Sequence, residues 1–253
     1  IIKNNNKNLI CSQWNEDPVM QSLDYSKKNI ENIKIYSDLV DHNFITTHPD
    51  ILKKQKINIK NVHFLFVPVD RNIECFDVYK SRPAMDLFYA MSHGVNRATL
   101  KKGKIDDRII FLDKLTKKMK NINYDFYGFK NKEPIWGNQF YMALINSKMG
   151  LNLSRGLPTK YYSSNRIASL IGNGLLTFID KKTLLTDFFN KDEIISYDNV
   201  HDLSDKINFY KNNDKKRILI AKKGKQKYFK LFNELKITKY IINKSMGIPS
   251  NLY

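Results

Sequence analysis

The segment Gly150–Phe189 constrains the fold of this chain more than any other part of the sequence. A short apolar run, Gly150–Leu153, ends at a polar stretch, and a helix-length segment then leads through Asn173-Gly174 into a second apolar run, Leu175–Ile179. A strand, a polar loop, a helix, a glycine-marked turn and a second strand together make a βαβ unit. The polar loop of such a unit lies at the carboxyl end of a strand, where open α/β sheets bind ligands.

The same alternation extends through most of the chain after Asp86. Strands are predicted at Asp86–Ser92, Tyr124–Phe129, Gly150–Leu153, Leu175–Ile179 and Glu193–Tyr197, and helices at Asp106–Lys120, Asn138–Asn146, Asn165–Ile171, Thr183–Phe189 and Val200–Tyr210. Parallel strands joined by helices through right-handed crossovers are typical of doubly wound sheets. The sequence therefore predicts an α/β fold whose main part is a doubly wound parallel sheet.

The pattern is less regular before Arg82-Pro83. Strands are predicted at Leu9–Ser12, Phe44–Thr47 and Val62–Val67, separated by helical stretches. This again indicates α/β structure, although the strands are too few for a complete independent sheet. Because proline forces the residue before it into an extended path, Arg82-Pro83 is interpreted as a linker between the two parts.

Composition excludes global disorder and gives a weak indication of the compartment. Hydrophobic residues make up 42% of the 253 residues and aromatic residues 12%, which is enough for a substantial core. No apolar run approaches the length of a membrane span. The two cysteines, Cys11 and Cys75, give neither a disulfide framework nor a metal-binding spacing, so a cytoplasmic location is expected.

A formal net charge of +18 raises the question of an anionic partner. Nucleic acid is one candidate, but the lysines are scattered over most predicted helices and no nucleic-acid-binding motif is present, so this class is not favoured. An anionic membrane surface is a second candidate, because Lys215–Lys230 is basic and carries the large apolar residues Ile218, Leu219, Ile220, Tyr228 and Phe229. The alternative for this segment is a docked helix with a solvated basic face.

Two loops after predicted strands carry groups suited to phosphate. The first holds His93, Gly94 and Arg97, where glycine lets the backbone approach a diphosphate and arginine pairs with it. The second loop holds Arg155, Tyr162, Ser163, Ser164, Asn165 and Arg166. Each has a structural alternative: an ordinary strand-to-helix turn for the first, a helix N-cap at Ser164 or Asn165 and a surface salt bridge of Arg166 for the second.

A third loop, after the first predicted strand, resembles a surface that faces sugars. It contains Gln13, Trp14, Glu16 and Asp17. Tryptophan stacks on sugar rings, and a carboxylate can act as a general base toward a hydroxyl group. Asp17 is preferred to Glu16 as that base. The alternative is a capped turn in which Asp17 is the N-cap of a helix that begins at Pro18.

Four features of the sequence resemble the sugar-donor-binding core of the group 1 glycosyltransferases. They are the run LNLSR at Leu151–Arg155, the segment Ser164–Ile167, Gly174 and the pair Phe188-Phe189. The branch that is similar to spore-coat maturation proteins shares this pattern most closely. The resemblance implies the GT-B arrangement of two Rossmann-like domains facing across a cleft. On this basis, residues 1–83 form a shortened acceptor-side domain, residues 84–236 the nucleotide-sugar-binding domain, and residues 237–253 a closing helix and tail.

The resemblance also implies a function. The chain is expected to move a sugar from a nucleotide-sugar to a glycan, a lipid-linked saccharide or a protein. The nucleotide-sugar is a co-substrate, and neither a metal nor another cofactor is expected, in agreement with the absence of any Asp-x-Asp or histidine-rich cluster. The residues expected at the sugar donor are His93, Gly94, Arg97, Arg155, Tyr162, Ser163, Ser164, Asn165, Arg166 and Gly174, with Gln13 and Trp14 on the acceptor side and Asp17 or Glu16 as the catalytic base.

The sequence departs from the pattern at one pair of positions. Many retaining relatives carry a Glu-x7-Glu pair, and the count from Gly174 reaches Ser169 and Thr177 instead. The contacts that such carboxylates make to sugar and ribose must come from other residues or be absent. A non-catalytic nucleotide-sugar-binding protein of the same fold and a basic nucleic-acid-binding protein are the alternatives. An epimerase of the same architecture would need acid–base pairs that the sequence does not place convincingly.

Overall fold

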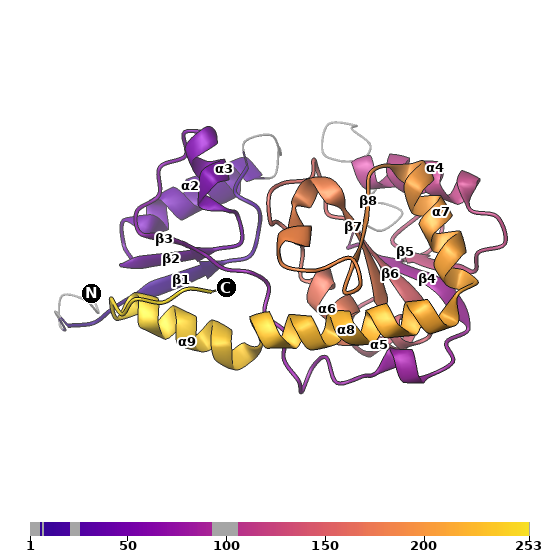
Figure 1. Ribbon diagram of the computed structural model, residues 1–253. Helices are drawn as coiled ribbons and strands as arrows, with labels where there is room; N and C mark the ends of the chain where they lie inside the picture. The colour runs from indigo at the N-terminus through magenta and orange to yellow at the C-terminus, as the bar shows by residue number, and fades with distance from the viewer. Residues whose placement is uncertain (1–5, 7, 21–25, 93–105, 253) are drawn as a thin grey trace.

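The structure is a computed structural model that describes residues 6, 8–20, 26–92 and 106–252. Two β-sheets lie beside each other, a smaller one from the first third of the chain and a larger one from the rest (Figure 1). The strand order is β1-β2-β3 in the smaller sheet and β5-β4-β6-β7-β8 in the larger sheet. Every described strand pair is parallel, which confirms the α/β prediction.

The smaller sheet contains β1 (Ser12–Asn15), β2 (His42–Ile45) and β3 (Val62–Phe64), with helices α2 (Ser26–Ser37) and α3 (Pro49–Lys54) between them. Its first strand begins later than predicted. Pairing starts at Ser12, opposite His42, so the apolar residues Leu9 and Ile10 precede the strand. Gln13 and Trp14 therefore lie within β1 and not in a loop after it.

The larger sheet shows the predicted alternation. Its elements are β4 (Met85–Ala90), α4 (Asp107–Lys118), β5 (Tyr124–Tyr127), α5 (Gly137–Ile145), β6 (Ser147–Asn152), α6 (Arg166–Gly172), β7 (Leu176–Asp180), β8 (Ile195–Tyr197), α7 (Val200–Lys211) and α8 (Asp214–Phe232). After β5 the chain returns past β4 to form β6, so the strand order reverses between β4 and β6. In open α/β sheets this reversal creates a ligand-binding crevice at the carboxyl ends of the two strands.

The helix predicted at Thr183–Phe189 is instead two 3₁₀ turns, Lys181–Thr183 and Leu185–Asp187. Leu184 separates them with a left-handed φ of 55°. A right-handed helix cannot continue through a residue in that conformation, so the segment folds as two short turns.

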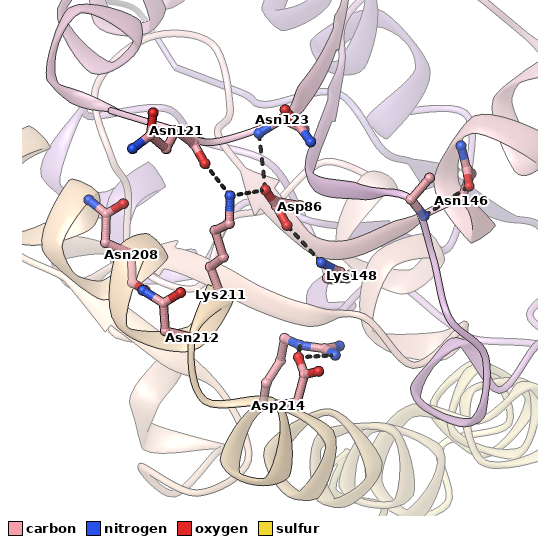
Figure 2. A network of polar contacts seen from close by, with 11 residues as sticks. Asp86, Asn121, Asn123, Asn146, Lys148, Asn208, Lys211, Asn212 and Asp214 are labelled. Carbon is pink, nitrogen blue, oxygen red and sulfur yellow. Dashed lines mark hydrogen bonds and ion pairs between the residues drawn. The ribbon is translucent and has the colours of Figure 1, made fainter.

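A polar network at the amino-terminal edge of the larger sheet fixes β4 to its neighbours (Figure 2). Asp86 is 1% exposed, and its carboxylate contacts Lys148 Nζ at 2.8 Å and Lys211 Nζ at 3.0 Å. The Asn123 amide also donates to it at 3.0 Å. Burial acts to raise the pKa of Asp86, but the hydrogen bonds from Lys148, Asn123 and Lys211 outweigh it and leave the pKa lowered. The network joins β4, β6 and the end of α7.

The basic helix α8 packs its apolar residues inward. Ile220, Tyr228 and Phe229 are at most 9% exposed, whereas Leu219 is 51% exposed. This burial agrees with the docked-helix alternative and leaves little apolar surface on α8 for a membrane. No helix in the described parts of the chain combines the length and the apolar composition needed to cross a bilayer.

The chain crosses between the two sheets at two places that touch each other. The Val69 amide donates to Phe232 O at 2.9 Å, and the Glu234 amide donates to Val69 O at 3.0 Å. Helix α9 (Glu234–Ser245) then runs along the smaller sheet, where Tyr240 meets Phe44 edge-on with 6.2 Å between the ring centroids (Figure 1). The division at residues 83 and 236 stays a prediction.

Candidate functional site

A cleft of about 500 Å³ opens between the two sheets, at the carboxyl ends of β4 and β6. Its lining comes from the end of β1, the end of β4, the start of α5 and the start of α6. The lining residues are Glu16, Asp17, Ala90, Met91, Ser92, Ile135, Trp136, Phe140, Tyr162, Ser164, Asn165, Arg166 and Ser169. The cleft thus brings together six predicted site residues from two distant loops, at the strand-order reversal where ligands bind in such folds.

The side chain of Arg166, the first residue of α6, spans the ends of β4 and β6. Its Nε donates to Ala90 O at 2.8 Å, and its Nη1 donates to Leu153 O at 3.1 Å and to Ser164 Oγ at 3.2 Å. The guanidinium carbon lies 4.7 Å from the centre of the Tyr89 ring, so a cation–π contact adds to these bonds. The surface salt bridge considered for Arg166 is therefore not its role in this structure.

The charge of Arg166 has no carboxylate partner among the described residues. Burial lowers its pKa from the ordinary value, and the neighbouring positive charge of Arg108 acts in the same direction. Carbonyl oxygens and an aromatic ring only partly replace the water that such a cation loses. An anion in the cleft would supply the missing charge, and a phosphate group matches the guanidinium fork.

Two other arginines, Arg108 and Arg155, lie beside one buried carboxylate, that of Asp106. Asp106 caps α4, and its fully buried carboxylate holds Arg108 through bonds of 2.7 Å and 3.0 Å. The Nε of Arg155 is 3.8 Å from the same carboxylate. This ion pairing holds Arg155 beside Asp106, and Arg155 is not among the described residues that line the cleft. Arg155 thus differs from Arg166, whose charge faces the cleft without a carboxylate.

Arg108 was not predicted as a site residue, although the sequence contains a signal for it. Arg108, Leu112 and Leu115 follow one another at helical spacing on the buried face of α4. A charged residue on an otherwise apolar helix face needs a buried partner. That partner, Asp106, lies two positions earlier in the sequence.

The remaining predicted residues of the second loop have different roles. Ser163 is 2% exposed and exchanges hydrogen bonds with the side chain of Asn152, so it anchors the loop to the end of β6. Tyr162 separates the cleft from a smaller cavity of about 120 Å³ that reaches Asp180 at the end of β7. Asn165 holds the N-cap position of α6 without a side-chain capping bond. Its amide instead donates to Glu16 Oε2 at 2.6 Å.

The two candidate bases stand at the cleft in different environments. Glu16 is held by Asn165, whereas the carboxylate of Asp17 has no hydrogen bond or ion pair within the described residues. Asp17 lies in a bend and Pro18 is not helical, so the alternative of a helix cap at Asp17 is wrong. Next to them, Gln13 donates to Asn43 Oδ1, and Trp14 is 43% exposed on β1.

Three predicted positions are not described by the structure, and a fourth lies away from the cleft. His93, Gly94 and Arg97 are outside the described residues. Gly174, with φ of +80°, precedes β7 at the opposite edge of the sheet, where a Cβ would meet the Tyr79 ring at 2.6 Å. Gly174 therefore permits close packing, but away from the cleft.

The two positions at which the carboxylates are missing, Ser169 and Thr177, lie in different parts of the fold. Ser169 lines the cleft from α6. Thr177 is buried inside β7, and its hydroxyl donates to Leu175 O at 3.1 Å. A carboxylate at Thr177 would not reach the cleft. Within the described residues, no group of three or more His, Cys, Asp or Glu side chains is arranged to hold a metal ion.

The sequence matches one protein family. Residues 108–235, about half of the chain, match the family described as "Glycosyl transferase-like". No curated protein sequence matches the chain closely enough to indicate homology.

Three solved structures illustrate the similarity in fold. The chain is similar to TarM from S. aureus (TM-score 0.62, 12% identity, covering 95% of this chain and 51% of that one). It is similar to Anabaena Alr3699/HepE in complex with UDP (TM-score 0.63, 9% identity, covering 94% of this chain and 72% of that one). It is also similar to an alpha-glucosyltransferase in complex with UDP and DNA (TM-score 0.60, 13% identity, covering 93% of this chain and 71% of that one). The chain thus spans about half the length of TarM, and these similarities confirm the GT-B-like fold.

Proposed function

The chain belongs to the glycosyl transferase-like family, and we propose that it transfers a sugar from a nucleotide-sugar to an acceptor hydroxyl group. The observation that carries the proposal is the half-buried guanidinium of Arg166 at the strand-order reversal. It faces the cleft and has no carboxylate partner among the described residues. A diphosphate would supply the missing negative charge at the point where charge develops as the sugar leaves.

In the proposed reaction, the acceptor oxygen forms a bond to the anomeric carbon of the sugar. The bond from that carbon to the diphosphate oxygen breaks, and its electron pair leaves with the nucleoside diphosphate. Arg166 stabilises the leaving charge. The acceptor hydroxyl loses its proton to a carboxylate, for which Asp17 is preferred because it has no partner among the described residues, with Glu16 as the second candidate.

The nucleotide and the location of the reaction are further parts of the proposal. UDP is the first nucleotide to test, because two of the similar solved structures contain it. The acceptor is a glycan, a lipid-linked saccharide or a protein, and the transfer needs no metal. We place the reaction in the cytoplasm, with the nucleotide on the part formed by residues 84–236 and the acceptor facing residues 1–83.

A non-catalytic protein that binds a nucleotide-sugar is the alternative. The absence of a carboxylate at Ser169, which lines the cleft, favours it. Release of UDP from a UDP-sugar in the presence of an acceptor distinguishes the two functions. Tight binding without any turnover across a broad acceptor panel would support the alternative.

The first experiment is a thermal-shift screen with UDP-, GDP-, CMP- and dTDP-sugars at fixed salt, followed by calorimetry. A ligand that binds only the folded protein raises its melting temperature by mass action. We expect one nucleotide to stand out, and Arg166→Met to weaken its binding at least tenfold, on the order of 1.4 kcal/mol. Arg82→Met, at an exposed arginine away from the cleft, is the matched control. Equal affinity in both variants would overturn the assignment of Arg166.

A further inference from the structure

A groove of about 420 Å³ lies beside the cleft, on the other side of the contact between Glu16 and Asn165. The cleft and the groove share Glu16, Asn165 and Ser169 as lining residues. A molecule in the groove therefore reaches the cleft at Glu16, one residue from Asp17. This position suits the second substrate of the proposed transfer.

The charge of the groove is opposite to that of the whole protein. Its lining contains four carboxylate residues, Glu16, Asp70, Glu74 and Glu234. None of the described lining residues is Lys, Arg or His, although the chain has a net charge of +18. Lys225 lies close enough for its positive charge to act on Glu74, but its Nζ forms an ion pair with Asp77 at 3.0 Å. Phosphate or carboxylate groups would be repelled here.

The groove also presents hydrogen-bond acceptors that the protein does not fully use. Glu234 Oε2 is buried and receives no hydrogen bond from the described residues. Glu74 is 6% exposed and accepts from the Asp70 amide at 3.0 Å. Since a buried polar atom without a partner is costly, a ligand that donates hydrogen bonds would be favoured.

The remaining walls are aromatic and aliphatic. Trp14 is 43% exposed on β1 and lines the groove, with Tyr141 from α5. Aliphatic side chains of Val67, Ile237 and Ile241 complete the surface. Carboxylate acceptors beside an indole fit a molecule with hydroxyl groups at its edge and C–H groups on its face, which is the chemistry of a sugar ring.

We propose that this groove binds the acceptor of the transfer, and that the bound portion is an uncharged saccharide without phosphate or carboxylate groups. The inference rests on the proposed function, and it adds the acceptor's chemical class and its binding residues. Trp14 stacks on the sugar ring, and Glu74 and Glu234 accept hydrogen bonds from its hydroxyl groups. The reactive hydroxyl points toward Glu16 and Asp17. A phosphate-bearing acceptor portion is excluded from the groove by the same carboxylates.

The chain offers a direct optical test, because it has two tryptophans, and Trp14 lies in the groove whereas Trp136 lines the cleft. In a Trp136→Phe background, Trp14 is the single indole. Its fluorescence is titrated with maltotriose, cellotriose and chitotriose and with their 6-phosphorylated counterparts, both without and with saturating UDP. We expect a saturable change with at least one neutral trisaccharide and at least about tenfold weaker binding of its phosphorylated form.

A charge variant tests the cause of this selectivity. Glu74→Gln combined with Glu234→Gln keeps the size of both side chains and removes their charge. The preference for the neutral saccharide is expected to fall severalfold in this variant. Asp205→Asn, at an exposed position on α7, is the matched control and leaves the preference unchanged.

Two results would overturn the inference. One is a Trp14 signal that responds to no neutral saccharide, with or without UDP. The other is binding of the phosphorylated saccharide that is as tight as binding of the neutral one. Neither result depends on Arg166, whose role is tested by nucleotide calorimetry, so failure of the groove and failure of the proposed function are distinguishable.

Discussion

Glu16 and Asn165, separated by 149 positions in the sequence, meet at 2.6 Å between the carboxylate Oε2 and the amide Nδ2. This hydrogen bond joins the end of β1 to the start of α6, across the cleft. It also forms the partition between the cleft and the groove beside it. The contact therefore connects the two sheets at the place where both proposed substrates meet.

Replacing Asn165 by Asp is expected to lower the melting temperature at pH 7, because two carboxylates would then face each other. The coupling free energy with Glu16→Gln should be about 0.5–1 kcal/mol, as is usual for exposed charge pairs. A double-mutant cycle from thermal unfolding measures it. Purely additive effects of the two substitutions would show that the contact is not maintained in solution.

Arg166→Met is expected to leave the melting temperature of the ligand-free protein within a few degrees of the original, or to raise it. The substitution loses the hydrogen bonds to Ala90 and Leu153, but it also removes a half-buried charge that no described carboxylate neutralises. In contrast, the stabilisation by UDP should fall, in line with the weaker nucleotide binding expected for this variant. Thermal unfolding with and without UDP separates the two effects, and a large loss of stability without ligand would contradict this prediction.

Gly174→Ala is expected to destabilise the protein more than Gly247→Ala. Both glycines have positive φ, +80° and +70°, so the backbone strain is similar. A Cβ at Gly174 meets the Tyr79 ring at 2.6 Å, whereas a Cβ at Gly247 meets nothing within 4 Å. The expected excess is about 1–3 kcal/mol, the usual range for overpacking. Urea unfolding of the two variants measures it, and equal losses would refute the clash.

Asp86→Asn is expected to cost about 2 kcal/mol at pH 7, because it leaves Lys148 and Lys211 without their shared carboxylate. Since the pKa of Asp86 is lowered in the folded protein, its stabilisation is complete above the unfolded value of 3.8 and is lost as the pH falls through the folded value. Urea unfolding between pH 7 and pH 3 measures both effects. Asp113→Asn, at an exposed ion pair, should show neither.

The larger sheet was predictable because its strands and helices alternate regularly and its strands are buried on both faces. Local patterns also indicated Arg166 and Asp17, since polar residues after buried strands gather at one edge of a parallel sheet. The later start of β1 was not predictable, because apolar Leu9 and Ile10 favour a strand and only the pairing with His42 decides where it begins.

Contacts between distant residues were beyond the sequence pattern. Arg155 and Arg166 look equivalent in the sequence. Only the fold shows that Arg155 pairs with Asp106, whereas Arg166 bonds to the carbonyl oxygen of Ala90 and has no described carboxylate partner. The same holds for Glu234, which belongs to the groove because α9 folds back onto the smaller sheet. Single-sequence reasoning identifies such residue types, but not which of them meet.

The two crossings between the sheets are joined to each other through Val69, which bonds to Phe232 on one side and to Glu234 on the other. Neither crossing can shift alone without breaking these bonds, so the two crossings are held together as one unit. The contact between Glu16 and Asn165 is made by other segments, at the mouth shared by the cleft and the groove. Together with the ion pair between Lys160 and Asp50 at 2.7 Å, it holds the two sheets together away from the crossings, so both sheets supply the boundary that the cleft and the groove share.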